Sequence, residues 1–200
     1  MINIVVFASG SGTNFQAIIN AVEDGRIDGT IRGLITNKSA ITAIDRAKNH
    51  GIEHRVIAPS EFHTLKDYTN ELLRQLRKWD TNLIALAGYM VKIPDEVIKT
   101  YRGRIVNIHP SLLPKYGGKG FYGINVHQAV IDNNDSESGC TVHLVTEEYD
   151  DGPILAQRKV PVKKGDDAET LAARVLKQEH QLFPEVIAKI ANELNSKTNN

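Results

Sequence analysis

The chain alternates short, nearly continuous apolar runs with longer segments whose apolar residues recur at helical spacing. Residues 2–7 form the first apolar run, which is typical of a strand buried on both faces of a sheet. After a loop at residues 8–14, apolar residues from Phe15 to Val22 recur with the period of an amphipathic helix, and Gly25 ends it. The chain therefore opens with a strand, a glycine-rich loop and a helix.

The same unit repeats along the chain. Further strands are predicted at residues 31–36, 53–57, 83–87, 104–108, 141–145 and 154–162. Further helices are predicted at residues 42–49 and 65–79, from Pro94, at residues 123–131 and from about residue 167, with Pro184 marking a break in the last one. This alternation predicts a three-layer α/β fold, in which an open, mostly parallel sheet carries helices on both faces and the last strand is antiparallel.

The length and composition fit a single globular unit. At 200 residues the chain has the size of one domain, at most two. Its hydrophobic content of 41% and its charged content of 24% are ordinary for a globular protein. No repeat, low-complexity segment or linker interrupts the sequence, so we expect one domain over residues 1–194 and a frayed tail over residues 195–200.

Charge and cysteine content narrow the class of protein. Lys+Arg and Asp+Glu both number 24, so no net charge attracts the chain to nucleic acid or to an anionic membrane. The N-terminus lacks the basic region of a signal peptide, and its apolar run is too short for a membrane span, so we expect a cytoplasmic location. The single cysteine, Cys140, excludes a disulfide within the chain and a cysteine-based metal cluster. Its place in a predicted strand favours a buried, unreactive thiol.

The glycine-rich loop before the first helix is a candidate anion site. In such a turn the main-chain N–H groups and the positive end of the helix point outward together. Phe15 stands where a dinucleotide-binding loop needs its third glycine, and no lysine follows as a nucleotide-triphosphate loop requires. Gly12, Thr13 and Asn14 are suited instead to the terminal phosphate of a small substrate. The alternative is a tight turn that binds nothing.

Asn107 and His109 form the strongest candidate for chemistry. They lie two residues apart on a predicted strand and therefore face the same side, near the strand's carboxyl end, where open α/β sheets bind their ligands. An amide and an imidazole side by side can donate hydrogen bonds to one oxygen, as a tetrahedral acyl-transfer intermediate requires. A capping asparagine and a satisfied core histidine are the alternative for either residue alone.

The acidic turn at residues 147–153 is a weaker indication, because most such turns are solvated loops. A carboxylate near His109 would raise the pKa of the imidazole and favour its protonated, donating form. The turn therefore becomes informative only if the fold brings it to His109.

Two of these segments together resemble a known family. Residues 107–114 read Asn-Ile-His-Pro-Ser-Leu-Leu-Pro, and residues 150–153 read Asp-Asp-Gly-Pro. This pair resembles the signature of the 10-formyltetrahydrofolate-dependent formyltransferases. Ser-Gly-Ser-Gly-Thr-Asn at residues 9–14, Ala-Gly-Tyr-Met at 87–90 and Gln-Glu-His at 178–180 are most similar to the members that formylate glycinamide ribonucleotide. The resemblance runs from residue 2 to about residue 190 and implies a Rossmann-like formyltransferase fold.

The resemblance implies roles for individual residues. The catalytic residues would be Asn107, His109 and Asp150. The substrate would be held at its phosphate by Gly12, Thr13 and Asn14, and at its glycinamide end by Glu179. The folate pocket would be lined, largely through main-chain groups, by Met90, Val91, Lys92, Ile93, Thr146 and Asp150. Glu179 has support of its own, because it lies one turn after Val175 on an apolar stripe, where an unpaired charge would be costly.

The resemblance also implies the reactants and the division of labour. Residues 1 to about 100 would bind the substrate and its phosphate, and residues 101 to about 190 would bind folate and catalyse the reaction. The co-substrate would be 10-formyltetrahydrofolate, the acceptor glycinamide ribonucleotide, and no metal would take part. We expect no nucleic-acid or membrane partner, and a monomer or weak homodimer.

Several alternatives stay open at this point. The chain could be a formyltetrahydrofolate hydrolase, an amino-sugar formyltransferase, or a non-catalytic module that binds folate or phosphate. Val91 and Leu65 depart from the family pattern, since many relatives carry basic residues there that would contact the folate glutamate. Residues 115–123 are a candidate flap over the substrate, and His127 near it is a further candidate contact.

Overall fold

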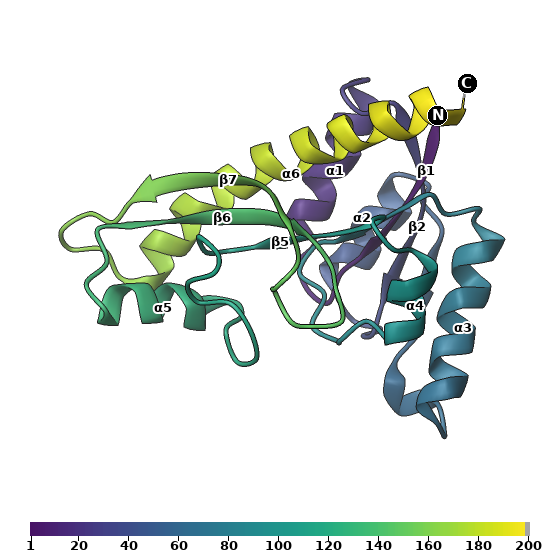
Figure 1. The fold of residues 1–200 in the computed structure, drawn as a ribbon, viewed down its shortest axis with the longest axis horizontal. Coiled ribbons are helices and arrows are strands. Elements are labelled where there is room, and N and C mark those ends of the chain that lie inside the picture. Colours follow the sequence, from purple (N-terminus) through teal and green to yellow (C-terminus); the bar gives the residue numbers. More distant parts are fainter. Residues whose placement is uncertain (199–200) are drawn as a thin grey trace.

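One seven-stranded sheet runs through the computed structural model, which describes residues 1–198 (Figure 1). The strands are β1 (Ile2–Phe7), β2 (Gly29–Thr36), β3 (His54–Val56), β4 (Leu83–Leu86), β5 (Ile105–His109), β6 (Glu137–Leu144) and β7 (Ile154–Pro161). Their order is β3-β2-β1-β4-β5-β6-β7. Strands β1 to β5 are parallel, β6 is antiparallel to β5, and β7 is antiparallel to β6. The predicted fold class and the antiparallel last strand are confirmed, and the reversal of β6 is an addition to them.

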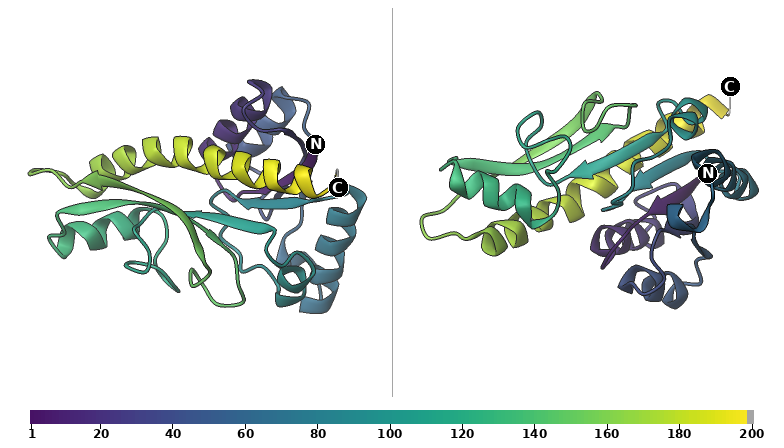
Figure 2. Two further views of the ribbon diagram at one scale, coloured as in Figure 1. Left: turned by 45° about the horizontal axis from the view of Figure 1, so that its top comes forward. Right: turned by 90° about the horizontal axis from the view of Figure 1, so that it is seen from below.

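Helices cover both faces of this sheet (Figure 2). They are α1 (Thr13–Glu23), α2 (Thr42–Asn49), a short 3-10 helix η1 (Pro59–Glu61), α3 (Leu65–Lys78), α4 (Asp95–Thr100), α5 (Ile124–Asp132) and α6 (Ala168–Thr198). Helices α1, α2, α5 and α6 share one apolar core with the sheet, and α3 and α4 share the other. Strand β1 serves both, since Ile4 and Val6 enter the first core and Val5 and Phe7 the second. Burial on both faces explains its nearly continuous apolar run, which only Asn3 interrupts.

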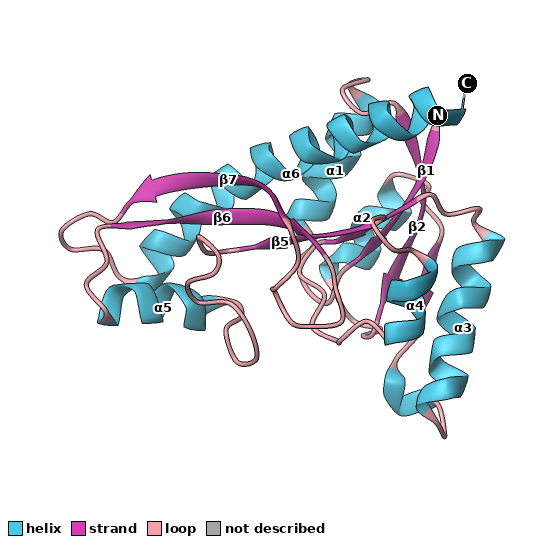
Figure 3. Cartoon of the chain, in the orientation of Figure 1, coloured by secondary structure: helices cyan, strands magenta, loops and turns pink. Residues whose placement is uncertain are grey.

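Helix α6 continues through Pro184, so the predicted break there is wrong (Figure 3). A proline inside a helix removes one main-chain hydrogen bond and crowds the preceding turn. Buried side chains on both sides of it, Val175 before and Ile187 after, belong to the same core. Packing of both halves against that core keeps the helix continuous across the proline.

The end of the chain also differs from the expectation of a frayed tail beginning at residue 195. Helix α6 extends to Thr198, and the Asn195 side-chain amide donates hydrogen bonds to the main-chain oxygen of Asp28 at 2.9 Å and to its carboxylate at 2.6 Å. These bonds tie the last helical turn to the loop before β2. Residues 199 and 200, the rest of the predicted tail, lie outside the described residues.

The carboxyl ends of β1, β4 and β5 meet at one edge of the sheet, which is where open α/β sheets bind ligands. The loops after β1 and β4 are joined directly. The Ser9 N–H donates to the Gly88 carbonyl at 3.1 Å, and the Met90 N–H donates to the Ser9 hydroxyl at 2.9 Å. This edge therefore gathers the predicted phosphate loop, the predicted folate segment and the end of β5.

Candidate active site

Asn107 lies on β5 directly across from His143 on β6. The Asn107 amide nitrogen is 3.0 Å from Nε2 of His143, and Nδ1 of His143 is 2.9 Å from the Leu144 carbonyl oxygen. Because a carbonyl oxygen only accepts, Nδ1 of His143 carries a hydrogen, and the Asn107 amide is directed to Nε2. One of the two amide hydrogens of Asn107 is used in this bond, and the other remains for a ligand.

His109 is buried two residues further along β5. Its Nε2–H donates to the Tyr116 carbonyl at 2.7 Å, and its Nδ1 lies 3.7 Å from the Asp150 carboxylate. Burial lowers the pKa of His109, whereas Asp150 and the Tyr116 carbonyl raise it, and burial prevails. The sequence led us to expect a protonated ring. In the unliganded protein the direction is the opposite, because desolvation outweighs the single carboxylate.

Asp150 reaches this cluster from the turn after β6. Its carboxylate accepts a hydrogen bond from the Gly118 N–H at 2.9 Å and lies 3.5 Å from Nε2 of His143. Burial raises the pKa of Asp150, but the contacts with His143, His109 and Gly118 outweigh it and hold the pKa below the ordinary value. The fold thus brings the acidic turn to His109, as the weaker indication in the sequence required.

Together these groups form a site in which Asn107 can donate a hydrogen bond to a ligand at once and His109 can do so only after a change. Asn107 offers an unused amide hydrogen, whereas the Nε2–H of His109 is engaged by Tyr116. His109 can present a second donor by gaining a proton at Nδ1, which lies on the Asp150 side of the ring. Such a site can stabilise an oxygen that acquires negative charge during a reaction.

His143 was not among the candidates taken from the sequence. Its position opposite Asn107 depends on the antiparallel pairing of β5 with β6. The residue alternation within β6 would have placed His143 and Thr141 on one face, but the neighbouring strand was not identifiable from the sequence. Ser9, which joins the first loop to Met90, was missed for a similar reason, because its partners lie far away along the chain.

The predicted substrate residues gather at the start of α1. The Asn14 amide donates to the Glu179 carboxylate at 2.6 Å, so the buried glutamate has the partner that the sequence analysis required. Burial raises the pKa of Glu179, and the bond from Asn14 offsets this only in part. Because Asn14 is directed to Glu179, the donors left for an anion at this loop are the main-chain N–H groups and Thr13.

Gly12 is held in a conformation that other residues rarely adopt. Its φ is +70°, and a Cβ atom there would lie 2.7 Å from the Cβ of Ala43. We expect Gly12→Ala to lower the free energy of unfolding by about 1–3 kcal/mol and to weaken binding of a phosphorylated substrate. Urea unfolding and isothermal titration with the ribonucleotide measure the two effects.

Gly10 provides the matched control in the same loop. A Cβ atom at Gly10 meets nothing within 4 Å, and its φ lies outside the left-handed region. Gly10→Ala should therefore leave stability close to that of the parent protein. Equal stabilities for the two variants would contradict the strain assigned to Gly12.

The predicted folate segments lie next to each other. The Lys92 ammonium group is 5.8 Å from the ring centre of Tyr149, which joins the loop after β4 to the turn before Asp150. Met90 and Tyr149 are both 50% exposed at this junction, whereas the side chain of Ile93 is buried in the second core. The Thr146 hydroxyl contacts the Glu148 carbonyl at 3.4 Å. Of this set, Ile93 can therefore contact a ligand only through its main chain.

Other features bear on the class of protein. Over residues 1–198 no group of three or more His, Cys, Asp or Glu side chains is arranged to hold a metal ion. None of the helices in that range has the length and apolar character needed to cross a membrane. Cys140 is fully buried, and burial raises the pKa of its thiol to about 12, which agrees with the expected unreactive thiol.

The sequence of the chain matches a known protein family and several of its members. The formyl transferase family matches residues 2–187. The chain is 45% identical over 190 residues to the chloroplastic phosphoribosylglycinamide formyltransferase of Vigna unguiculata, with 95% of this chain and 61% of that protein covered. It is 40% identical over 190 residues to the phosphoribosylglycinamide formyltransferase of Escherichia coli (strain K12), with 95% of this chain and 87% of that protein covered.

A solved structure shows the same fold. Glycinamide ribonucleotide transformylase 1 from Symbiobacterium toebii superposes with a TM-score of 0.91 at 35% identity, and 96% of this chain and 89% of that chain are covered. The chain spans less than two thirds of the Vigna protein and most of the Escherichia coli protein. The motif at residues 107–114, the sheet order and these matches agree. This chain belongs to the formyl transferase family.

Proposed function

We propose that the chain transfers a formyl group from 10-formyltetrahydrofolate to the amine of glycinamide ribonucleotide, giving formylglycinamide ribonucleotide and tetrahydrofolate. The reaction belongs to de novo purine biosynthesis. The observation that carries the proposal is the cluster of Asn107, His109 and Asp150 in a chain 40% identical to a curated phosphoribosylglycinamide formyltransferase over nearly its whole length. An amide donor and an imidazole can stabilise the charge that develops on a formyl oxygen, and a carboxylate can accept the proton of an attacking amine.

The residues beside this cluster fit a flat folate ring system. Met90 and Tyr149 offer exposed apolar surface. The main-chain groups of residues 90–93 and of Thr146 are assigned as polar partners, except the Met90 N–H, which donates to the Ser9 hydroxyl. When bound, the folate supplies a formyl carbonyl whose oxygen gains negative charge under attack by the substrate amine. Met90, Val91, Lys92, Ile93, Thr146 and Asp150 are assigned to this pocket, largely through main-chain groups.

The side chains of the cluster act on that oxygen and on the proton of the amine. The free amide hydrogen of Asn107 donates to the oxygen as charge develops. The negative charge on the formyl oxygen and that of the Asp150 carboxylate together favour a proton on Nδ1 of His109. This nitrogen lies 3.7 Å from the carboxylate. Asp150 keeps His109 oriented and passes the amine proton onward, so the leaving nitrogen departs neutral. The proton that Nδ1 gains as charge develops is released again when the charge on the oxygen is lost, so the reaction takes up no net proton.

The proposal assigns the two halves of the single domain to different reactants. Residues 1 to about 100 hold the ribonucleotide phosphate at Gly12, Thr13 and the main-chain N–H of Asn14, whose side chain is directed to Glu179. Residues 101 to about 190 bind folate and carry the catalytic cluster. Glu179 reaches the first half from α6 and holds the glycinamide end. Its bond with Asn14 links the two parts of the substrate site.

The first experiment separates this function from its alternatives. Purified protein is mixed with glycinamide ribonucleotide and a 10-formylfolate donor, and absorbance of the deformylated folate is followed. Absorbance change that requires the ribonucleotide is the expected result. Change without it indicates a hydrolase. No change, with folate still raising the melting temperature, indicates an amino-sugar acceptor or a binding module.

The remaining assignments concern assembly and location. We propose a monomer or weak homodimer in the cytoplasm, with neither nucleic acid nor a membrane as partner. Equal numbers of basic and acidic residues, 24 each, support the absence of a charged macromolecular partner. The chloroplastic relative makes an organelle the alternative location. Sedimentation velocity over a range of concentrations tests the assembly.

A further inference from the structure

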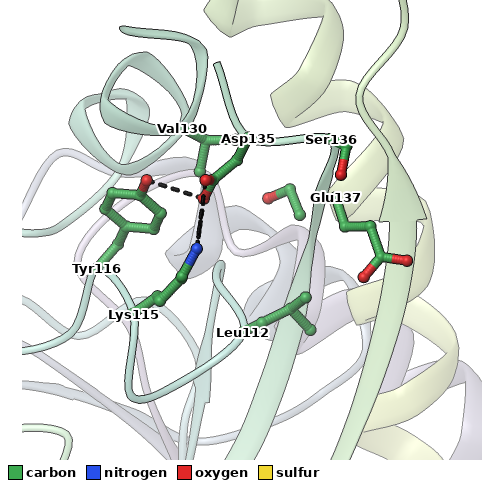
Figure 4. Close-up of a pocket in the computed structure, with 8 residues that line it drawn as sticks. Leu112, Lys115, Tyr116, Val130, Asp135, Ser136 and Glu137 are labelled. Carbon is green, nitrogen blue, oxygen red and sulfur yellow. Dashed lines mark hydrogen bonds and ion pairs between the residues drawn. The ribbon is translucent and has the colours of Figure 1, made fainter. Parts of the chain in front are cut away.

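Asp135, in the turn between α5 and β6, contacts two consecutive residues of the loop that follows β5. Its carboxylate accepts a hydrogen bond from the Tyr116 hydroxyl at 2.9 Å and two from the Lys115 ammonium group at 3.2 Å each (Figure 4). The side chain of Asp135 is 21% exposed, whereas that of Lys115 is 68% exposed. The bond from Tyr116 is therefore the better shielded of the contacts and the stronger anchor.

The same loop contacts the catalytic cluster on its other side. The Tyr116 carbonyl accepts the Nε2–H of His109 at 2.7 Å, and the Gly118 N–H donates to Asp150 at 2.9 Å. Residues 116–118 thus lie between Asp135 and two of the three predicted catalytic side chains. A shift of the Tyr116 main chain would change what His109 donates to.

The Tyr116 main chain needs an anchor of this kind. Its φ is +55°, a left-handed conformation that a bulky residue rarely adopts and that costs about 1–3 kcal/mol. Such a conformation persists only where neighbouring contacts hold it. The Ser111 hydroxyl donates to the Lys115 carbonyl at 2.6 Å on one side, and Asp135 holds the side chains of Lys115 and Tyr116.

A cavity of about 220 Å³ borders these contacts, lined among others by Leu112, Val130 and Asp135. Removal of the Asp135 carboxylate would enlarge this cavity and leave the Tyr116 hydroxyl without the acceptor that it has now. The Tyr116 ring would still pack edge-on against Phe121, at 5.8 Å between ring centres. The hydrogen bond from the Tyr116 hydroxyl to Asp135 would be lost.

We infer that Asp135 is a positioning residue, which acts through the Tyr116 hydroxyl to hold the Tyr116 carbonyl on His109 and the Gly118 N–H on Asp150. The inference deepens the proposed function, because it assigns a remote residue to the same site. Asp135 itself touches neither the catalytic side chains nor, in this scheme, a substrate.

The test uses variants that remove the anchor from either end. Asp135→Ala removes the acceptor, and Tyr116→Phe removes only the hydroxyl while keeping the ring and the main-chain carbonyl. We expect each to lower kcat roughly tenfold, as small displacements of catalytic groups do. The double variant should be no slower than the slower single variant, because both changes break one contact. Asp135→Asn keeps an oxygen acceptor and should restore most of the rate.

Glu137 supplies the matched control. It is an acidic residue that lines the same cavity, and its carboxylate pairs with Lys159 at 2.8 Å, a residue outside the loop. Glu137→Ala removes the same charge from the same region and should leave kcat within twofold of the parent. Additive losses in the double variant, or an equal loss in Glu137→Ala, would overturn the inference.

A measurement that does not depend on catalysis tests this inference separately from the proposed function. The imidazole of His109 is titrated by NMR in the free protein, with its signals assigned from a His109→Asn sample. Three kinds of group face this ring, namely Asp150, the histidines 127 and 143, and the Tyr116 carbonyl, which raises its pKa. Loss of the Tyr116 contact should therefore lower the pKa of His109 in both Asp135→Ala and Tyr116→Phe. Unchanged His109 signals in folded Tyr116→Phe protein would overturn the inference, whatever reaction the protein catalyses.

Discussion

Replacement of Asn107 by alanine is expected to lower kcat for formyl transfer by about 10²–10³-fold, equivalent to roughly 3–4 kcal/mol of transition-state stabilisation. In the unliganded structure Asn107 has one amide hydrogen on His143 at 3.0 Å and the other available for the formyl oxygen. The loss should fall on kcat, with little change in KM, because the oxygen becomes a strong acceptor only as charge develops. Steady-state kinetics with both substrates measures the split.

Two further measurements show whether the loss of rate comes from the missing amide donor or from a change in the fold. Asn107→Asp keeps the shape of the side chain but replaces the donor by a negative charge, so it should be no faster than the alanine variant. Melting temperatures of both variants show whether the fold survives loss of the bond to His143. An Asn107→Ala protein that keeps near-full turnover would remove the amide from the mechanism.

Acidification is expected to destabilise the protein through His127, a buried side chain of α5. His127 is 4% exposed, and its Nδ1 has no hydrogen-bond partner within residues 1–198. Burial lowers the pKa of this ring to about 4, with a smaller effect of His109 in the same direction. The folded protein thus keeps His127 neutral where the unfolded chain, with an ordinary histidine pKa near 6.5, takes up a proton.

The sign of the effect follows from that difference. Between pH 6.5 and about 4 the unfolded state binds more protons, so the free energy of unfolding falls as the pH falls. At about 1.4 kcal/mol per pH unit, the loss from His127 alone reaches about 3 kcal/mol across that window. Above pH 6.5 this contribution to stability is fully present.

Urea unfolding at pH 7.5 and pH 4.5 tests this expectation. Because other buried groups titrate in the same range, the relevant quantity is the difference between the parent protein and His127→Gln. The variant should lose less stability on acidification than the parent, by up to about 3 kcal/mol. His63→Gln, in the exposed turn before α3, should behave as the parent does. Parallel losses in parent and His127→Gln would show that His127 does not carry the effect.

Local patterns in the sequence were sufficient for most of the secondary structure. Strand β1 is recognisable because alternate residues enter two cores, which leaves Asn3 as its one polar residue. The strands and helices expected along the chain are found with shifts of a few residues at their ends. Element ends depend on individual hydrogen bonds, which an apolar pattern does not specify.

The features of the fold that the sequence did not show share one physical origin. The uninterrupted α6 at Pro184 depends on packing of both halves of the helix against one core. The reversal of β6 depends on which strand it pairs with. Both are set by contacts between residues far apart along the chain, and local propensity carries no information about them.

The candidate residues of the site were recognisable in the chain because they lie in short motifs. Asn107 and His109 follow from strand alternation and from the resemblance at residues 107–114, and Asp150 from the Asp-Asp-Gly-Pro turn. Their catalytic roles remain predictions. Motifs identify which side chains are available for chemistry, because the type and spacing of residues are local properties of the chain.

The contacts that govern those side chains exist only in the folded molecule. His143 reaches Asn107 across an antiparallel strand pair, and the Tyr116 carbonyl and the Gly118 N–H reach His109 and Asp150 from a loop. The pKa of His109 shows the consequence, since burial lowers it although a carboxylate lies 3.7 Å away. Desolvation depends on every atom packed around a group, so the balance between burial and charge follows from the packed three-dimensional structure and not from a motif.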